Sequence, residues 1–133
     1  MANYCMNTVD ITGEKEEVRK LAIALRDSYK EFKNDPSLGF NNFCDAVLGN
    51  TYIKYENGDW TYGTKWWDLD VESYSDGSLT LSGTSAWSPP LYFIEQISKV
   101  YNVDASIEYS EEGFDTSGRI NYSNGVLISE EEY

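Results

Sequence analysis

Residues 65–84 read KWWDLDVESYSDGSLTLSGT. Both arms of this stretch alternate between apolar and polar residues, which is the period of a strand that buries one face. Asp76-Gly77 separates the arms and is a tight-turn pair, so we predict a hairpin of strands Lys65–Tyr74 and Ser78–Thr84. The residues expected to face the core are Trp67, Leu69, Val71, Leu79 and Leu81. Those expected on the opposite face are Trp66, Asp68, Asp70, Glu72, Thr80 and Ser82.

A strand and a helix are expected before this hairpin. Residues 3–12 alternate, and one face of this strand carries Cys5, Asn7, Val9 and Ile11. A helix follows, with Thr12 or Gly13 as its N-cap, and ends at Asn34-Asp35-Pro36. Its apolar stripe at helical spacing comprises Val18, Leu21, Ala22, Leu25, Tyr29 and Phe32. Residues 35–62 form an insert, where Thr51–Glu56 and the turn pair Asn57-Gly58 indicate a further hairpin.

A second helix and three strands are expected after the hairpin. Ser88 is predicted to cap the helix, with Pro89 in its first turn, and Asn102 to end it. Its buried stripe comprises Phe93, Ile94, Ile97, Val100 and Tyr101. The strands expected next are Asp104–Ser110, Gly118–Ser123 and, after the turn Asn124-Gly125, Val126–Ser129. Residues 130–133 are expected to form a frayed tail.

This order of elements predicts a single α+β domain over residues 1–133. It is the ferredoxin-like split βαβ pattern, an antiparallel sheet with two helices on one face, with an insert after the first helix and an extra C-terminal strand. Ile107 and Tyr109 are expected to face the helices. The uncovered face of the sheet is then acidic, and Arg119 is its main cation. Its expected carboxylates are Asp10, Asp68, Asp70, Glu72 and Glu108.

Several short segments carry a family resemblance. They are Met1–Thr8, Gly63–Trp66, Thr84–Pro90, Glu111–Gly113 and Gly118–Ile120. In this order they resemble the YubB-like ferredoxin-like domain family of phages, prophages and plasmids. The resemblance spans nearly the whole chain, and residues 35–62 depart from it. It implies the fold and an origin in a mobile element, and it transfers no catalytic residues.

Charge and composition exclude several classes of function. The chain has 23 acidic and 10 basic residues and no histidine. Residues 67–133 carry 13 of the acidic residues against Lys99 and Arg119, a net charge of −11. Such a surface repels nucleic acid and anionic membranes. No catalytic constellation, cofactor motif or metal-ligand spacing appears, so we expect neither an enzyme nor a cofactor. Cys5 and Cys44 are expected as reduced thiols in the cytoplasm of a bacterial host, since no signal peptide or apolar span precedes them.

The acidic strands provide the candidate binding site. Its members are Asp68, Asp70, Glu72, Asp76, Glu108, Glu111, Glu112, Asp115 and an exposed Trp66 as an apolar anchor. We expect an accessory protein that binds a basic surface of a host protein and inhibits it, because the carboxylates imitate nucleic acid. A nucleic-acid-handling defence factor, as in anti-CRISPR or anti-restriction proteins, is the expected target. The plainer interpretation is a solvated acidic face that only keeps the protein soluble.

Two further interpretations stay open. A small enzyme or ligand-binding domain would have a pocket between the insert and the sheet, lined by Tyr52, Tyr55, Trp60 and Tyr62. A self-associating protein would instead add its last strand, Val126–Ser129, to the sheet edge of a neighbour. A deep pocket with converging carboxylates would favour the first interpretation, and a concentration-dependent mass would favour the second.

Overall fold

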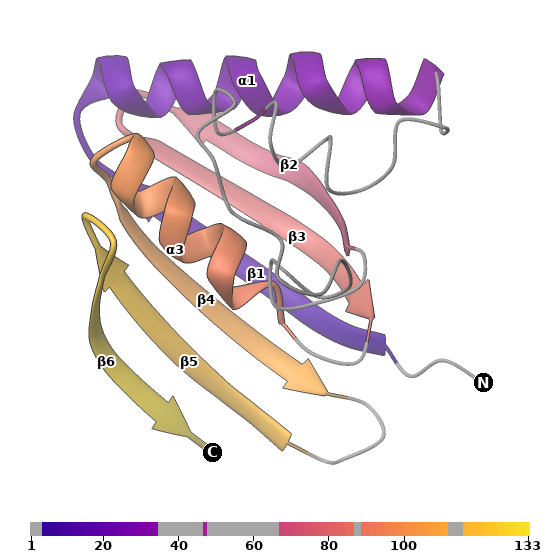
Figure 1. The fold of residues 1–133 in the computed structure, drawn as a ribbon, viewed down its shortest axis with the longest axis vertical. Coiled ribbons are helices and arrows are strands. Elements are labelled where there is room, and N and C mark those ends of the chain that lie inside the picture. Colours follow the sequence, from indigo (N-terminus) through magenta and orange to yellow (C-terminus); the bar gives the residue numbers. More distant parts are fainter. Residues whose placement is uncertain (1–3, 35–46, 48–66, 87–88, 112–115) are drawn as a thin grey trace, which may run out of the picture.

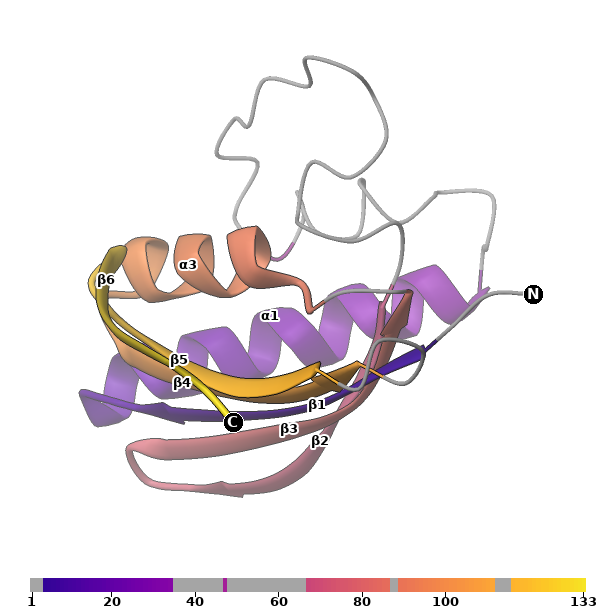
Figure 2. The ribbon, with the colours of Figure 1, turned by 90° about the horizontal axis from the view of Figure 1, so that it is seen from below.

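The computed structural model describes residues 4–34, 47, 67–86, 89–111 and 116–133. These residues form two layers, a six-stranded antiparallel sheet and two helices that lie on the same side of it (Figures 1 and 2). In chain order the elements are β1 (Tyr4–Thr12), α1 (Lys15–Asn34), β2 (Trp67–Ser75), β3 (Ser78–Ala86), α3 (Leu91–Val100), β4 (Asp104–Glu111), β5 (Thr116–Ser123) and β6 (Val126–Glu132).

The strand order is β2-β3-β1-β4-β5-β6, and every neighbouring pair is antiparallel. Strands β1 and β2 therefore run in the same direction with β3 between them, and α1 leads out of β1 on the covered side. Helix α3 makes the equivalent crossover from β3 to β4, with β1 between those strands. This is the ferredoxin-like pattern, extended at one edge by β5 and β6, and it confirms the predicted fold.

The core lies between the helices and the inner face of the sheet. Alternation along β1 is strict, and Cys5, Asn7, Val9 and Ile11 are buried as predicted. The other buried apolar residues include Val18, Leu21 and Leu25 from α1, Leu79 and Leu81 from β3, Phe93, Ile94 and Ile97 from α3, and Ile107 and Ile120 from β4 and β5. Apart from Ile120, whose side was not predicted, these positions confirm the inward prediction because each element keeps its own period, 2 in the strands and 3.6 in the helices.

Strand β2 departs from the predicted alternation. Its register with β3 shifts between Val71 and Ser73, so Glu72 is an extra residue that has no partner on β3. Val71, predicted to be buried, is 45% exposed. Its register partner is the buried Leu81, so Val71 keeps the predicted inward side and is exposed because β2 is an edge strand; the bulge breaks the period of 2 only after Val71.

Helix α3 begins later than predicted. Its first residue is Leu91, and Pro90 occupies the N-cap position without a side-chain hydrogen bond. The second proline explains the difference, because a residue that precedes proline is disfavoured in the helical conformation and Pro89 therefore cannot start the helix. Val100, expected in the buried stripe, is 38% exposed.

The C-terminal strands are longer than predicted. Strand β4 reaches Glu111, β5 starts at Thr116, and β6 continues to Glu132, where it pairs with Gly118. Residues 130–132, expected in a frayed tail, thus belong to the sheet. The run of glutamates suggested solvation, but Gly118 lets β6 approach closely, because a Cβ atom there would collide with the carbonyl oxygen of Glu131. The further hairpin at Thr51–Glu56 lies outside the described residues.

Candidate acidic interaction face

The sheet face that neither helix covers is called the open face here. The six strands contribute ten carboxylates and one cation, Arg119, to the sheet as a whole. Helix α1, in the other layer, carries six basic and four acidic residues. The fold therefore separates the charges into an acidic sheet and a helix of slightly positive net charge.

The register places polar side chains of neighbouring strands side by side on the open face. Asp10 lies between Thr80 and Ser106, and Ser106 is opposite Asn121. Glu108 is opposite Arg119, and Arg119 is in turn opposite Glu131. Short hydroxyl and amide side chains thus lie between the carboxylates in these pairs.

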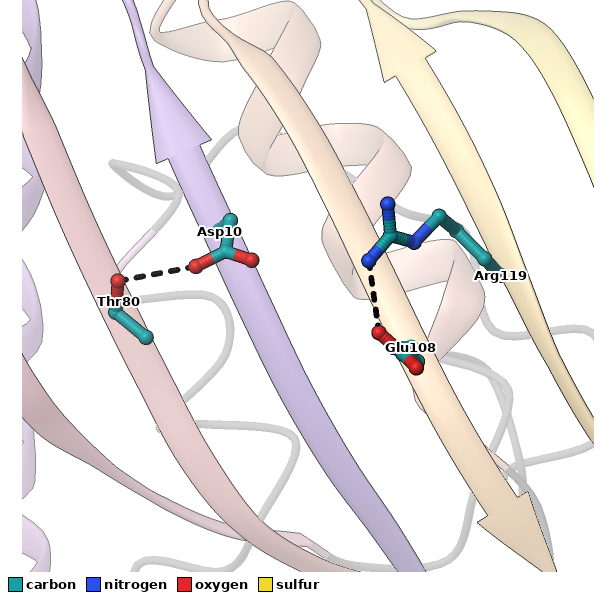
Figure 3. A network of polar contacts seen from close by, with 4 residues as sticks. All are labelled: Asp10, Thr80, Glu108 and Arg119. Carbon is teal, nitrogen blue, oxygen red and sulfur yellow. Dashed lines mark hydrogen bonds and ion pairs between the residues drawn. The ribbon is translucent and has the colours of Figure 1, made fainter.

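Four short contacts order this face. Thr80 Oγ1 donates to Asp10 Oδ1 at 3.0 Å, and Arg119 Nη2 donates to Glu108 Oε2 at 2.8 Å (Figure 3). Ser123 Oγ donates to Asp104 Oδ1 at 2.6 Å, and Asn121 Nδ2 donates to Ser129 Oγ at 2.8 Å. The hydrogen bond and the negative charge of Glu108 raise the pKa of the Arg119 guanidinium, so Arg119 stays charged at every physiological pH.

A shallow, solvent-open groove of about 600 Å³ lies on this face. Its polar lining comes from β1, β4 and β5, and Ile128 of β6 contributes an apolar side chain. The lining residues are Asp10, Thr12, Asp104, Ala105, Ser106, Arg119, Asn121, Tyr122, Ser123 and Ile128. Two carboxylates with hydroxyl and amide neighbours suit the ammonium or guanidinium end of a basic side chain.

The structure brings together only part of the site predicted from sequence. Asp70 is exposed on the open face, where its register partner is Ser82, and Asp68 of β2 is in register with Thr84. Glu108 also lies there, but the ion pair with Arg119 neutralises much of its charge. Trp66, Glu112 and Asp115 lie outside the described residues.

Three predicted members are placed differently. Glu72 is the extra residue of the β2 bulge. Asp76 lies in the β2–β3 turn and pairs with Lys15 of α1 at 3.3 Å, at the end of the sheet. Glu111 is in register with the buried Cys5, on the helix side of the sheet, where burial and, secondly, the charge of Glu132 raise its pKa. Glu111, predicted as a member of the acidic site, therefore does not lie on the open face.

Sequence reasoning missed Asp104 and Glu131. Asp104 has the same parity as Glu108 along β4, so alternation already placed it on the open face, and its carboxylate lines the groove. Glu131 was assigned to a frayed tail, and only the pairing of β6 with β5 brings it opposite Arg119. Among the described residues, no group of three or more His, Cys, Asp or Glu is arranged to hold a metal ion, and no helix is long and apolar enough to span a membrane.

A known protein family matches the part of the chain that carries most of the sheet. Residues 61–132, more than half of the chain, match the family described as the ferredoxin-like domain in Api92-like protein. The chain belongs to this family. The matched segment covers β2 to β6 and so includes most of the open face. The match shows an Api92-like ferredoxin-like domain, whereas the YubB-like relationship and the mobile-element origin stay predictions.

A solved structure supports the fold over the full length. The crystal structure of the protein api92 from Yersinia pseudotuberculosis is similar with a TM-score of 0.61 and 12% sequence identity, over 100% of this chain and 98% of that chain. At this identity the likeness concerns the fold alone. No curated protein gave a significant match.

Proposed function

We propose that this protein binds a basic, nucleic-acid-binding surface of another protein through its open face and thereby competes with nucleic acid. The observation that supports this proposal best is the segregation of charge: the strands carry ten carboxylates against one cation, and six of the eight described basic residues lie on α1. The register places five of these carboxylates, Asp10, Asp70, Asp104, Glu108 and Glu131, on the open face. Direct binding of nucleic acid by this sheet is unfavourable for the same reason, since its phosphates would approach carboxylates.

The open face suits a partner groove built for phosphates. Carboxylates such as Asp10, Asp70 and Asp104 are spread over three strands, and neighbouring strands lie about 4.8 Å apart. Each exposed ion pair contributes only about 0.2–1 kcal/mol, so stable binding needs several pairs formed together over a broad surface. The groove beside Asp10 and Asp104 gives one partner Lys or Arg side chain a more enclosed position.

The resemblance to a family of phages and mobile elements directs the proposal to a particular target class. A protein carried by such an element gains most by blocking host factors that act on its nucleic acid. We therefore propose a host nucleic-acid-handling defence factor as the partner, inhibited by occupation of its Lys/Arg groove. The ligand-binding alternative rests on Tyr52, Tyr55, Trp60 and Tyr62, which lie outside the described residues.

Charge reversal on the open face tests the proposal. Immobilised wild-type protein and the variant Asp70→Lys/Asp104→Lys are compared in capture from a bacterial lysate. The matched control, Glu16→Lys/Asp27→Lys, changes the net charge equally but on the exposed surface of α1. We expect the captured partner to be lost with the open-face variant and kept with the control, with both variants folded by circular dichroism. Equal capture by both folded variants would falsify the proposal.

A further inference from the structure

Strand β6 forms one edge of the sheet (Figure 1), and all seven of its residues are exposed. Its first three residues are apolar, yet Val126, Leu127 and Ile128 are 59%, 50% and 61% exposed. Three glutamates, Glu130–Glu132, follow after Ser129. An apolar run exposed on an edge strand is a potential pairing site for another chain, which proteins ordinarily avoid.

This edge is held firmly to the rest of the sheet. Ser129 Oγ accepts a hydrogen bond from Asn121 at 2.8 Å, and the backbone N–H of Tyr133 donates to the carbonyl of Ser117 at 2.9 Å. The missing side chain at Gly118 allows the close approach of Glu131. A register shift between Asn121 and Tyr122 leaves Ile128 without a partner on β5, and on each side of it the strand presents preorganised outer backbone groups.

The turn and the register show which backbone groups point outward. Asn124 and Gly125 both have positive φ, 49° and 82°, as in a two-residue type I′ turn, which makes Ser123 and Val126 a hydrogen-bonded pair. Bonding alternates along an antiparallel strand on each side of the register shift at Ile128, so Leu127, next to the bonded Val126, directs its N–H and C=O away from β5. Tyr133 is hydrogen-bonded to β5, so alternation from Tyr133 toward Ser129 also directs the backbone N–H and C=O groups of Glu132 and Glu130 away from β5.

The side chains of β6 specify the chemistry of a matching segment. Opposite-charge pairs across neighbouring strands stabilise a sheet, and like charges destabilise it. We propose that β6 is a docking edge for an extended segment of a partner protein that places basic residues opposite Glu130–Glu132 and apolar residues opposite Val126–Ile128. Backbone hydrogen bonds to Leu127, Glu130 and Glu132 supply affinity, and the charges supply selectivity and direction.

A second copy of this chain fits the same edge poorly. Antiparallel pairing of two β6 strands about Ser129 would set the three glutamates of each copy against the apolar residues of the other. Parallel pairing in register would set glutamates against glutamates. Each copy also carries a net charge of −13, which opposes association. Burial raises the pKa of Tyr109, and the charges of Glu111, Glu132 and Glu130 raise it further. This crowding of negative charge beside β6 favours a cationic partner.

The docking edge is independent of the proposed open-face function. On β6, Glu131 and Ser129 are in register with Arg119 and Asn121 and so lie on the open face, whereas Leu127, Glu130 and Glu132 lie on the other side of the strand. Failure of one proposal therefore leaves the other standing. Substitutions at Asp70 and Asp104 test the open face, whereas substitutions in β6 test the edge.

Synthetic peptides provide a direct probe. The peptide Lys-Lys-Lys-Ser-Val-Val-Val, with blocked ends, matches β6 in antiparallel register, and Glu-Glu-Glu-Ser-Val-Val-Val is its charge-reversed control. Binding and amide hydrogen exchange are followed by NMR on the full chain. We expect the basic peptide to bind and to slow the exchange of the Leu127, Glu130 and Glu132 amides. No binding, or binding that leaves these three amides unprotected, would overturn the proposal.

Variants of β6 separate strand pairing from simple charge attraction. Glu130→Lys/Glu132→Lys should bind the basic peptide at least about tenfold more weakly and the acidic peptide more tightly, whereas Glu16→Lys/Asp27→Lys should keep the wild-type preference. Leu127→Pro removes an outward N–H without removing a bond to β5 and should weaken binding more than Leu127→Ser. If the charge-swapped variant keeps the wild-type preference, the edge does not select by charge and the proposal fails.

Self-pairing is the remaining outcome. Light scattering at two protein concentrations measures the mass, and exchange is measured at the same concentrations without peptide. We expect a constant mass and unprotected Leu127, Glu130 and Glu132 amides. Protection that grows with protein concentration would assign the edge to a second copy and overturn the proposed heterologous partner.

Discussion

At the residue scale, Cys5 and its neighbours form a buried polar cluster. Asn7 Nδ2 donates to Ser85 Oγ at 2.9 Å and to the carbonyl of Cys5 at 3.2 Å, and the Cys5 thiol lies 3.6 Å from Asn7 Oδ1. Burial raises the pKa of the Cys5 thiol from 9.0 to about 11, and the charge of Glu111 adds to it, whereas the hydrogen bond with Ser85 opposes it. Cys5 is therefore a protonated, structural thiol at neutral pH.

The raised pKa of Cys5 predicts a loss of stability in alkali. Since the folded-state pKa lies above that of an exposed thiol, the stabilising contribution is complete below about pH 9 and disappears as the pH rises toward 11. We expect the free energy of unfolding to fall more between pH 8 and 10.5 for the wild type than for Cys5→Ser, whose hydroxyl does not titrate. Tyrosine ionisation affects both proteins, so equal losses would show that Cys5 is not the group responsible.

Arg119 is the second residue whose role follows from its position. Its ion pair with Glu108 is 42% and 48% exposed at the two side chains, so we expect Arg119→Gln to change the free energy of unfolding by no more than about 1 kcal/mol. The variant Arg119→Gln should bind a basic partner more tightly, because Glu108, Asp10 and Glu131 lose the cation beside them. Lys99→Gln, the same charge change in the helix layer, is the control and should have a smaller effect on affinity. Weaker binding by Arg119→Gln would instead make Arg119 a direct contact.

At the element scale, the attachment of β6 depends on the absence of a side chain at residue 118. A Cβ atom there would lie 2.9 Å from Tyr109 Oη in addition to its collision with Glu131. We expect Gly118→Ala to push β6 outward, to lower the free energy of unfolding by about 1–3 kcal/mol and to speed hydrogen exchange of the Tyr133 amide. Ser117→Ala is the control, and its Tyr133 amide should stay protected. An unchanged Gly118→Ala protein would mean that β6 is held differently.

The elements also show how far the sequence could predict the structure. Strict alternation in Tyr4–Thr12 and the spacing of Val18, Leu21 and Leu25 were sufficient for β1, α1 and the fold class, because one buried face imposes one period. The bulge at Glu72 could not be predicted, since no single residue type requires an extra position there. The length of β6 could not be predicted from the sequence either, because this strand is stabilised by pairing with β5 rather than by its own composition.

At the scale of the whole molecule, the separation of charge predicts how binding responds to salt. Exposed charges are screened beyond about 8 Å at physiological ionic strength and at shorter distances in more concentrated salt. We expect capture of the partner by the wild-type protein to weaken steeply as the salt concentration rises. Capture that is equal at low and high salt would indicate an apolar contact instead, for which Trp66, outside the described residues, is the candidate.

The central claim is that the open face occupies a site that its partner uses for nucleic acid. The most direct measurement is competition, in which the captured partner is titrated with duplex DNA and with RNA while its complex with this protein is followed by fluorescence anisotropy. The account predicts mutual exclusion, with the nucleic acid that the partner handles displacing the wild-type protein and no ternary complex forming. A stable ternary complex, with unchanged affinity for this protein at saturating nucleic acid, would contradict it.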